Sequence, residues 1–167
     1  QAILLNREDK NEKDKLLDFY AENFGRIGVL GRGIRNAQSK LAPNLMIFSR
    51  LEIVFVAKKS SPFSNGNGWL LTDAAEIDPF LNVKNNDEKF FKAGEFALFL
   101  KRFIAGQQED ANLWKIIVGG FNFLDKQNLN SEDLKNLDLL FRLRILKELG
   151  HLNQEEIDIP IFSDEWI

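Results

Sequence analysis

The segment FGRIGVLGRGIRNAQSKLAPNLMIFSR, residues 24–50, decides the fold of this chain. Over residues 26–33 apolar side chains alternate with glycine and arginine, which is typical of a short, twisted β-strand with little bulk on one face. Residues 34–41 have no strong period and predict a loop or a single helical turn that ends at Pro43. The segment therefore predicts a strand followed by a polar loop.

The same segment holds five cations and no acid over 27 positions, although the whole chain has a formal charge of -3. Residues 1–60 hold 11 Lys and Arg against 7 Asp and Glu, a net charge of +4, whereas residues 61–167 have a net charge of -7. A local reversal of charge of this kind indicates an anionic partner for the first half. The five cations are the candidate phosphate contacts: Arg26, Arg32, Arg35, Lys40 and Arg50.

Further strands are expected on both sides of this segment. Strands are predicted over residues 2–7, 50–57 and 69–77, and the alternation is clear over 50–57, where Leu51, Ile53 and Phe55 alternate with Glu52, Val54 and Val56. Residues 60–68 are rich in Ser, Asn, Gly and Pro and predict a connection between two of them. Residues 14–22 fit either a helix face or strand alternation, and their own pattern leans slightly to helix.

The period becomes helical from about residue 87. Apolar positions indicate three helices, over residues 90–104, 113–124 and 134–149. Asn130 or Ser131 can cap the third helix, and a glycine at position 150 can end it in a left-handed conformation. The second half is thus expected to form a small acidic helical domain.

Residues 2–55, AILLNREDKNEKDKLLDFYAENFGRIGVLGRGIRNAQSKLAPNLMIFSRLEIVF, resemble the N-terminal OB-fold domain of the bacterial DNA repair and recombination mediator RecO. The matching pieces include Glu12, the Gly25-Arg26 turn and the Ser39-Lys40-Leu41 step. Residues 140–152, LFRLRILKELGHL, are similar to the helix that closes the helical domain of that family. The resemblance implies a hairpin, not a helix, over residues 14–25, and we adopt the hairpin.

Together these features predict an α+β fold, with an N-terminal five-stranded OB-fold barrel followed by a small helical domain. The expected boundaries are 1–80 for a DNA-binding barrel, 81–152 for the helical domain and 153–167 for an acidic and hydrophobic tail. The resemblance implies a recombination mediator that binds single- and double-stranded DNA and anneals single strands. It also implies partnership with RecR and with the tail of single-strand-binding protein, and indirectly with the recombinase RecA.

No catalytic constellation is visible, so we expect no enzyme, no metal and no cofactor. The chain has no cysteine, which excludes disulfides and cysteine-ligated zinc. Its only histidine, His151, has no recognisable nucleophile beside it and is expected to decorate a helix end. Asp73, Glu76 and Asp78 could in principle collect a divalent ion, but acids at a strand end are far more often solvated.

Aromatic side chains offer stacking surfaces for bases, each with a competing role in the core: Phe19, Tyr20, Phe24 and Phe48. The tail sequence IDIPIF, residues 157–162, resembles the acidic tip of single-strand-binding protein. Chance explains this similarity better than a shared function does. No apolar run approaches the ~20 residues of a membrane span, so a cytoplasmic protein is expected, and the resemblance to a DNA-binding family implies association with the nucleoid. The alternative from another class is a protein-interaction adaptor with an OB-like barrel and no DNA binding.

Overall fold

The computed structural model describes residues 1–58 and 68–152, which form two compact units. The described part of the first comprises residues 1–58, 68–79 and 106–109, and that of the second comprises residues 80–105 and 110–152. The tail expected over residues 153–167, and all but the last residue of the connection expected over 60–68, lie outside the described residues.

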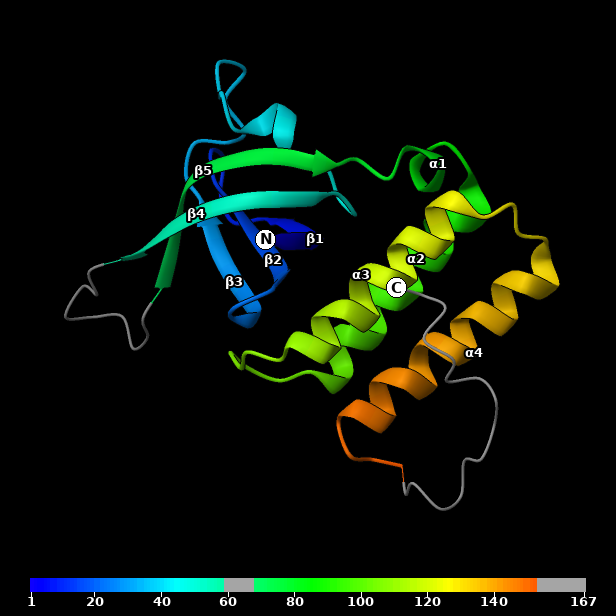
Figure 1. The fold of residues 1–167 in the computed structure, drawn as a ribbon. Helices are drawn as coiled ribbons and strands as arrows, with labels where there is room; N and C mark the ends of the chain where they lie inside the picture. Colours follow the sequence, from blue (N-terminus) through cyan, green and yellow to red (C-terminus); the bar gives the residue numbers. More distant parts are fainter. Residues whose placement is uncertain (59–67, 153–167) are drawn as a thin grey trace. The chain divides into compact units, whose positions relative to one another are not determined.

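The first unit is a five-stranded barrel (Figure 1). Its strands close in the order β1-β2-β3-β5-β4, with β3 and β5 parallel and the other neighbours antiparallel. A closed barrel of five strands with this crossover is the OB fold. The strand bounds are β1 Ala2–Asp9, β2 Lys15–Ala21, β3 Gly25–Gly31, β4 Arg50–Lys58 and β5 Gly68–Asp78.

The second unit is helical. It consists of the four-residue α1 (Leu81–Lys84), α2 (Asp87–Phe103), α3 (Ala111–Lys126) and α4 (Ser131–Glu148). The prediction of an OB barrel followed by helices is confirmed, but the count of three helices was wrong because α1 is too short to show a helical period. Aromatic rings, some stacked and some edge to face, pack in the core of this unit. The ring centroids of Phe96 and Phe141 are 3.9 Å apart.

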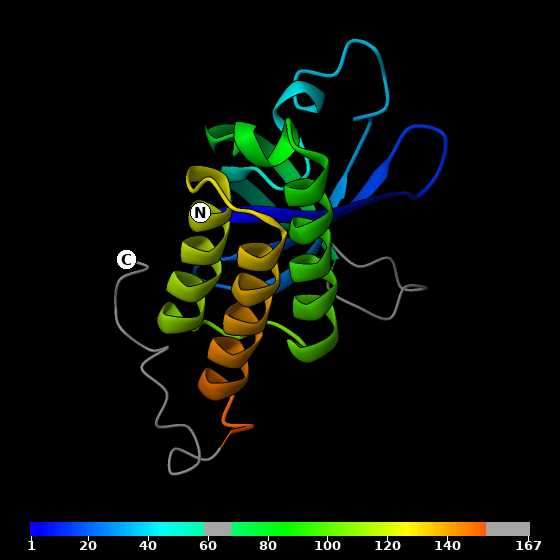
Figure 2. The same ribbon diagram turned by 90° about the vertical axis from the view of Figure 1, so that its right-hand side faces the viewer.

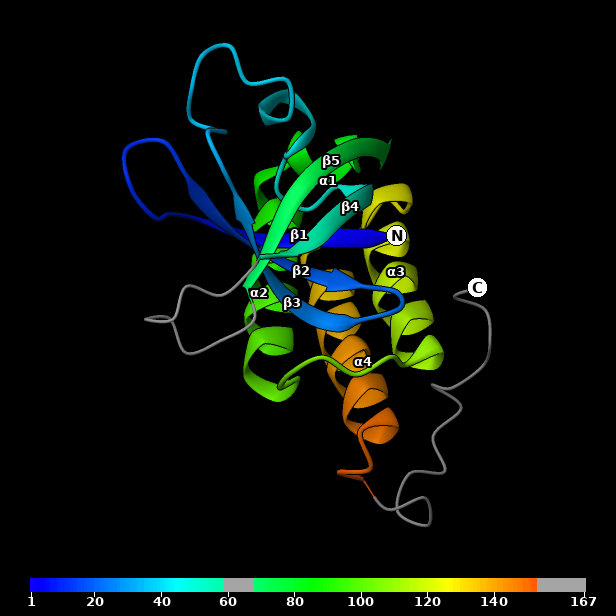
Figure 3. The same cartoon turned by 90° about the vertical axis from the view of Figure 1, so that its left-hand side faces the viewer.

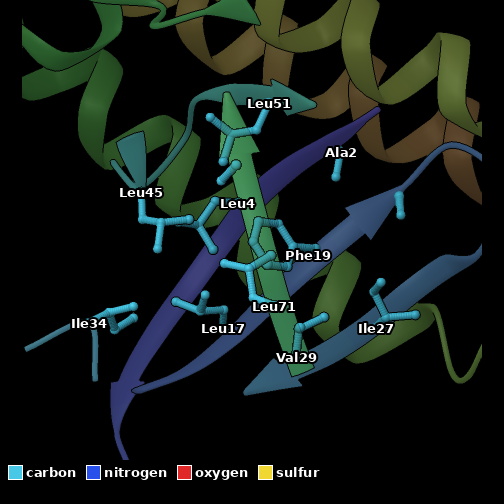
Figure 4. Close-up of a cluster of buried hydrophobic side chains, with 12 residues drawn as sticks. Ala2, Leu4, Leu17, Phe19, Ile27, Val29, Ile34, Leu45, Leu51 and Leu71 are labelled. Atoms are coloured by element: carbon cyan, nitrogen blue, oxygen red, sulfur yellow. The ribbon is translucent and has the colours of Figure 1, made fainter. Parts of the chain in front are cut away.

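The barrel core explains why residues 15–21 form a strand. Leu17, Phe19 and Ala21 point inward and are buried, in register with Val29, Ile27 and Gly25 of β3 (Figure 4). A helix would place only part of this set inside and would leave the edges of β1 and β3 unpaired. The hairpin chosen by resemblance is therefore confirmed, against the slight preference of the local pattern.

The caps of the last helix follow the sequence prediction. The Asn130 side chain accepts hydrogen bonds from the backbone N–H groups of Glu132 and Asp133, and the Asp133 carboxylate accepts one from the Asn130 N–H, which completes a capping box. Beyond the helix, Gly150 adopts a φ of 73°. Both ends of α4 are thus satisfied by local side chains and backbone geometry.

Candidate nucleic-acid interface

The chain that leaves β3 forms a polar loop, residues 32–41, which we call the basic loop. It is hydrogen-bonded to the β1–β2 turn, residues 10–14, and both segments can be followed from opposite sides in Figures 2 and 3. The backbone N–H of Arg35 donates to the carbonyl of Lys13 at 3.1 Å, and its guanidinium donates to the carbonyl of Asn11 at 2.7 Å. The basic loop is therefore tied to the turn by backbone acceptors.

A carboxylate completes this attachment. The Asp14 carboxylate accepts a hydrogen bond from the backbone N–H of Gly33 at 2.8 Å and another from the side chain of Asn11 at 3.0 Å. Gly33 adopts a φ of 65°, a conformation that a residue with a Cβ rarely takes. The Gly33 N–H, followed by the Asn11 amide, holds the pKa of Asp14 below its ordinary value of 3.8. Asp14 therefore holds the loop best when it is ionised.

A second carboxylate partly neutralises the cations. Asp9 forms ion pairs with Lys15 and, at 3.4 Å, with Arg35. The hydrogen bond from Lys15 is the largest cause that lowers the pKa of Asp9, and the charge of Arg35 adds to it. Because the Asp9 side chain is half exposed, its attraction to both cations is weakened by water and salt. A phosphate could therefore replace Asp9 beside Arg35 at modest cost.

Two other cations of the basic loop form no direct ion pair, although the charge of Arg32 helps to lower the pKa of Asp14. Arg32 and Lys40 are exposed and form no ion pair within residues 1–58 and 68–152. The loop between them surrounds a pocket of about 400 Å³, lined by glycine, alanine, serine and amide side chains. The loop thus presents positive charge with little bulk, which suits close approach of an anionic backbone.

The structure does not bring all five predicted cations into one cluster. The guanidinium of Arg26 makes a two-pronged ion pair with Asp18 of β2, with Nε–O and Nη2–O distances of 3.1 and 2.9 Å. It lies near the start of β3, whereas Arg32 follows the end of that strand, roughly 20 Å away at ~3.3 Å per residue. Arg26 is therefore committed to a structural partner, and its role in binding DNA stays a prediction.

Arg50 also lies away from the basic loop. It begins β4, where it pairs in register with Ile3 of β1 and Asp78 of β5. Its Nε atom is buried and has no hydrogen-bond acceptor among the described residues. A half-buried guanidinium of this kind presents less of its charge to a ligand than the cations of the basic loop do.

The aromatic candidates divide by burial. Phe19, Tyr20 and Phe48 are at most 3% exposed and belong to the core, as their competing interpretation held. Phe24 is 39% exposed. Its ring meets those of Phe55 and Trp69, two residues that were not predicted as stacking surfaces. The sequence around Phe55 and Trp69 predicted only strands. A strand pattern does not show which rings of different strands come together in the folded barrel.

That the chain uses no metal stays a prediction. Asp73, Glu76 and Asp78 lie along β5, and in residues 1–58 and 68–152 no three His or acidic side chains are grouped so as to hold a metal ion. His151 lies just past α4, and its ring centroid is 6.5 Å from that of Phe103. Among the described residues, 1–58 and 68–152, no helix is long and apolar enough to cross a membrane.

The barrel defines an OB-fold protein whose first unit carries a cationic loop beside the β1–β2 turn, and whose second unit is helical. Comparison with known proteins is more specific. Residues 1–67 match the family model described as "Recombination protein O N terminal". The resemblance to RecO stated above is therefore confirmed.

Curated relatives extend the likeness beyond the barrel. The chain is 24% identical over 151 residues to the DNA repair protein RecO of Clostridium novyi. The matched region covers 90% of this chain and 55% of that protein. It is 26% identical to the protein of the same name from Clostridium acetobutylicum and 25% identical to that from Enterococcus faecalis, again over 90% of this chain. The chain spans a little over half the length of these relatives.

Proposed function

We propose that this chain acts in DNA repair and recombination as a RecO-like protein that binds single- and double-stranded DNA and anneals complementary strands. The observation that carries the proposal is the basic loop, held beside the β1–β2 turn of an OB barrel. In OB folds the β1–β2 loop borders the surface that binds oligonucleotides. The match of residues 1–67 to the RecO N-terminal family supports the same assignment.

Annealing requires no bond chemistry. Two complementary strands repel each other through their phosphates, and cations that neutralise phosphates release counterions and lower this repulsion. Contacts that do not depend on sequence leave the bases free to search for register. Arg32 and Lys40 can bind phosphates directly, and Arg35 can do so by exchanging Asp9 for a phosphate.

The remaining part of the proposal concerns partners, and it rests on the family alone. A RecO-like mediator would act with RecR and with the tail of single-strand-binding protein to help load RecA onto single strands. No described contact identifies the surfaces that these proteins would use. The expected domain roles, with DNA binding assigned to residues 1–80, belong to the same proposal.

A binding titration tests the DNA contacts. Reversing both Arg32 and Arg35 to Glu should abolish binding of a single-stranded oligonucleotide, with the barrel still folded by circular dichroism. A matched control reverses Lys115 and Lys135, two exposed lysines of the helical unit. It changes the net charge equally and should leave binding within a few-fold of the parent chain. Equal loss in both double variants would show that only net charge matters and would refute the assigned site.

Salt dependence measures how many phosphates are neutralised. On a single strand the logarithm of the affinity falls with the logarithm of salt concentration by about 0.7 per phosphate. The three cations of the basic loop therefore predict a slope of about -2, whereas all five sequence candidates would give roughly -3 to -4. Binding with a slope near zero would refute the phosphate contacts. No binding at all at low salt would refute DNA binding and leave the protein-interaction adaptor as the better account.

A further inference from the structure

Three aromatic rings meet in the barrel unit. They are contributed by the β2–β3 turn, β4 and β5, and all three pairs are edge-to-face. The centroid distances are 5.0 Å for Phe24–Phe55, 5.0 Å for Phe55–Trp69 and 6.0 Å for Phe24–Trp69. We call Phe24, Phe55 and Trp69 the ring cluster.

The ring cluster is supported from below and open above. Phe55 and Trp69 pack on the buried core of the barrel, whose inward side chains include Ile27, Val29 and Leu71 (Figure 4). In contrast to the buried rings of the barrel, Phe24 is 39% exposed. Because its edge-to-face neighbours hold it, the Phe24 ring is an oriented apolar surface at the solvent boundary.

Trp69 adds a polar observation. Its indole N–H is buried, and it has no hydrogen-bond acceptor among residues 1–58 and 68–152. A buried donor without an acceptor destabilises a protein, and such groups are rare in native structures. The carbonyl and ring-nitrogen acceptors of a nucleobase are of the chemical kind that such a donor lacks here.

The ring cluster also lies near the connection between β4 and β5 in the barrel topology. Trp69 is the second residue of β5 and pairs in register with Val29 of β3. It thus lies where the β4–β5 connection enters the barrel beside β3. OB folds bind oligonucleotides on strands 2 and 3 between the β1–β2 and β4–β5 loops. Here the basic loop lies beside the first of these connections and the ring cluster lies at the base of the second.

We propose that Phe24, supported by Phe55 and Trp69, is a stacking surface for one unpaired nucleobase of a bound single strand. The inference rests on the proposed DNA binding and adds a base contact to it. A duplex keeps its bases stacked on each other, so the ring cluster gives single strands an advantage that phosphate contacts alone do not. Every base has a flat π-face, so this contact carries little sequence preference.

The test separates base contacts from phosphate contacts. Affinity is measured for an oligo-thymidine and for an abasic oligonucleotide of the same length, which keeps the phosphates and lacks the bases. The parent chain should bind the oligo-thymidine more tightly. Phe24→Leu, which keeps an apolar side chain but removes the ring, should weaken oligo-thymidine binding roughly 5-fold or more and leave abasic binding unchanged. The salt slope should not change, because no phosphate contact is lost.

Two variants control for folding and for nonspecific apolar contact. Phe24→Tyr keeps a ring and should restore oligo-thymidine affinity. Phe91→Leu removes a ring that is 70% exposed on α2 and should have no effect. In a background with Trp114→Phe and Trp166→Phe, Trp69 is the only tryptophan, and its emission should be quenched by oligo-thymidine but not by the abasic strand.

The outcomes distinguish this inference from the proposed function. If the parent chain binds oligo-thymidine and abasic strands equally, or if Phe24→Leu binds both as the parent does, the stacking surface is overturned while DNA binding stands. Weakened binding of a protein partner by Phe24→Leu, with unchanged DNA affinity, would overturn it in favour of a protein contact. If the parent chain binds neither oligonucleotide, the proposed function itself fails.

Discussion

Gly25, at the start of β3, is the position where a single added methyl group should cost the barrel most. Its φ is 66°, which favours glycine. A Cβ built there would collide with the backbone carbonyl oxygen of Gln108 and lie 2.9 Å from the Gln108 nitrogen. Residues 106–109 belong to the same compact unit as the barrel. Since the obstructing atoms are backbone, they cannot rotate away as a side chain would.

The magnitude follows from two separable costs. A left-handed conformation costs a residue with a Cβ about 1–2 kcal/mol. Inserting a carbon into a closely packed place costs about 1–3 kcal/mol more. Gly25→Ala should therefore lower the free energy of unfolding of the barrel by roughly 2–5 kcal/mol, a large fraction of the total for a small domain.

Two other glycines of the barrel separate these costs. Gly33 has nearly the same φ, 65°, but its nearest atom would be the amide nitrogen of Asn36 at 3.4 Å. Gly33→Ala should therefore show only the conformational cost of about 1–2 kcal/mol. Gly28 has an ordinary φ and would meet only a leucine methyl group at 3.8 Å, so Gly28→Ala should be nearly neutral.

The differences in unfolding free energy can be measured by urea unfolding. Monitoring the hydrogen exchange of the β2 and β3 amides restricts the measurement to the barrel. The expected order of destabilisation is Gly25→Ala, then Gly33→Ala, then Gly28→Ala. A Gly25→Ala variant no less stable than Gly33→Ala would show that residues 106–109 do not press on the β2–β3 turn, and would refute the packing argument.

Three further predictions concern single contacts. The pKa of Asp14 is lowered below 3.8, so the hydrogen bond that its carboxylate accepts from the basic loop is complete above pH 3.8 and is lost as the pH falls through the lowered pKa. The chemical shift of the Gly33 amide in an NMR titration should follow this loss. Asp14→Asn should remove the transition. Asn130→Ala removes the capping box of α4 and should cost about 1 kcal/mol in urea unfolding, whereas Ser131→Ala should cost a few tenths at most. Lys89 is 8% exposed and donates to two carbonyls at the end of α3, at 3.2 and 2.8 Å, so Lys89→Met should lower the unfolding free energy of the helical unit by about 1–2 kcal/mol; an unchanged value would show that water replaces the ammonium.

Local patterns were enough for most elements. The strands over residues 2–7, 50–57 and 69–77 and the three long helices were predicted within a few residues of their ends, because each is a run of apolar residues bounded by turn residues or caps. Residues 14–22 were not decided in this way. Their alternating inward set and their helical set overlap, and the choice depended on pairing with the strands on both sides.

The candidate site shows the same division more sharply. The sequence by itself determined that positive charge gathers in residues 24–50 and that acids dominate the second half, because charge depends only on composition. Only the tertiary structure decided which cations are available, since Asp18 reaches Arg26 across two paired strands and Asp9 reaches Arg35 from the neighbouring turn. Ion pairs and ring contacts depend on distances between segments far apart in the chain, and those distances exist only after the barrel has closed.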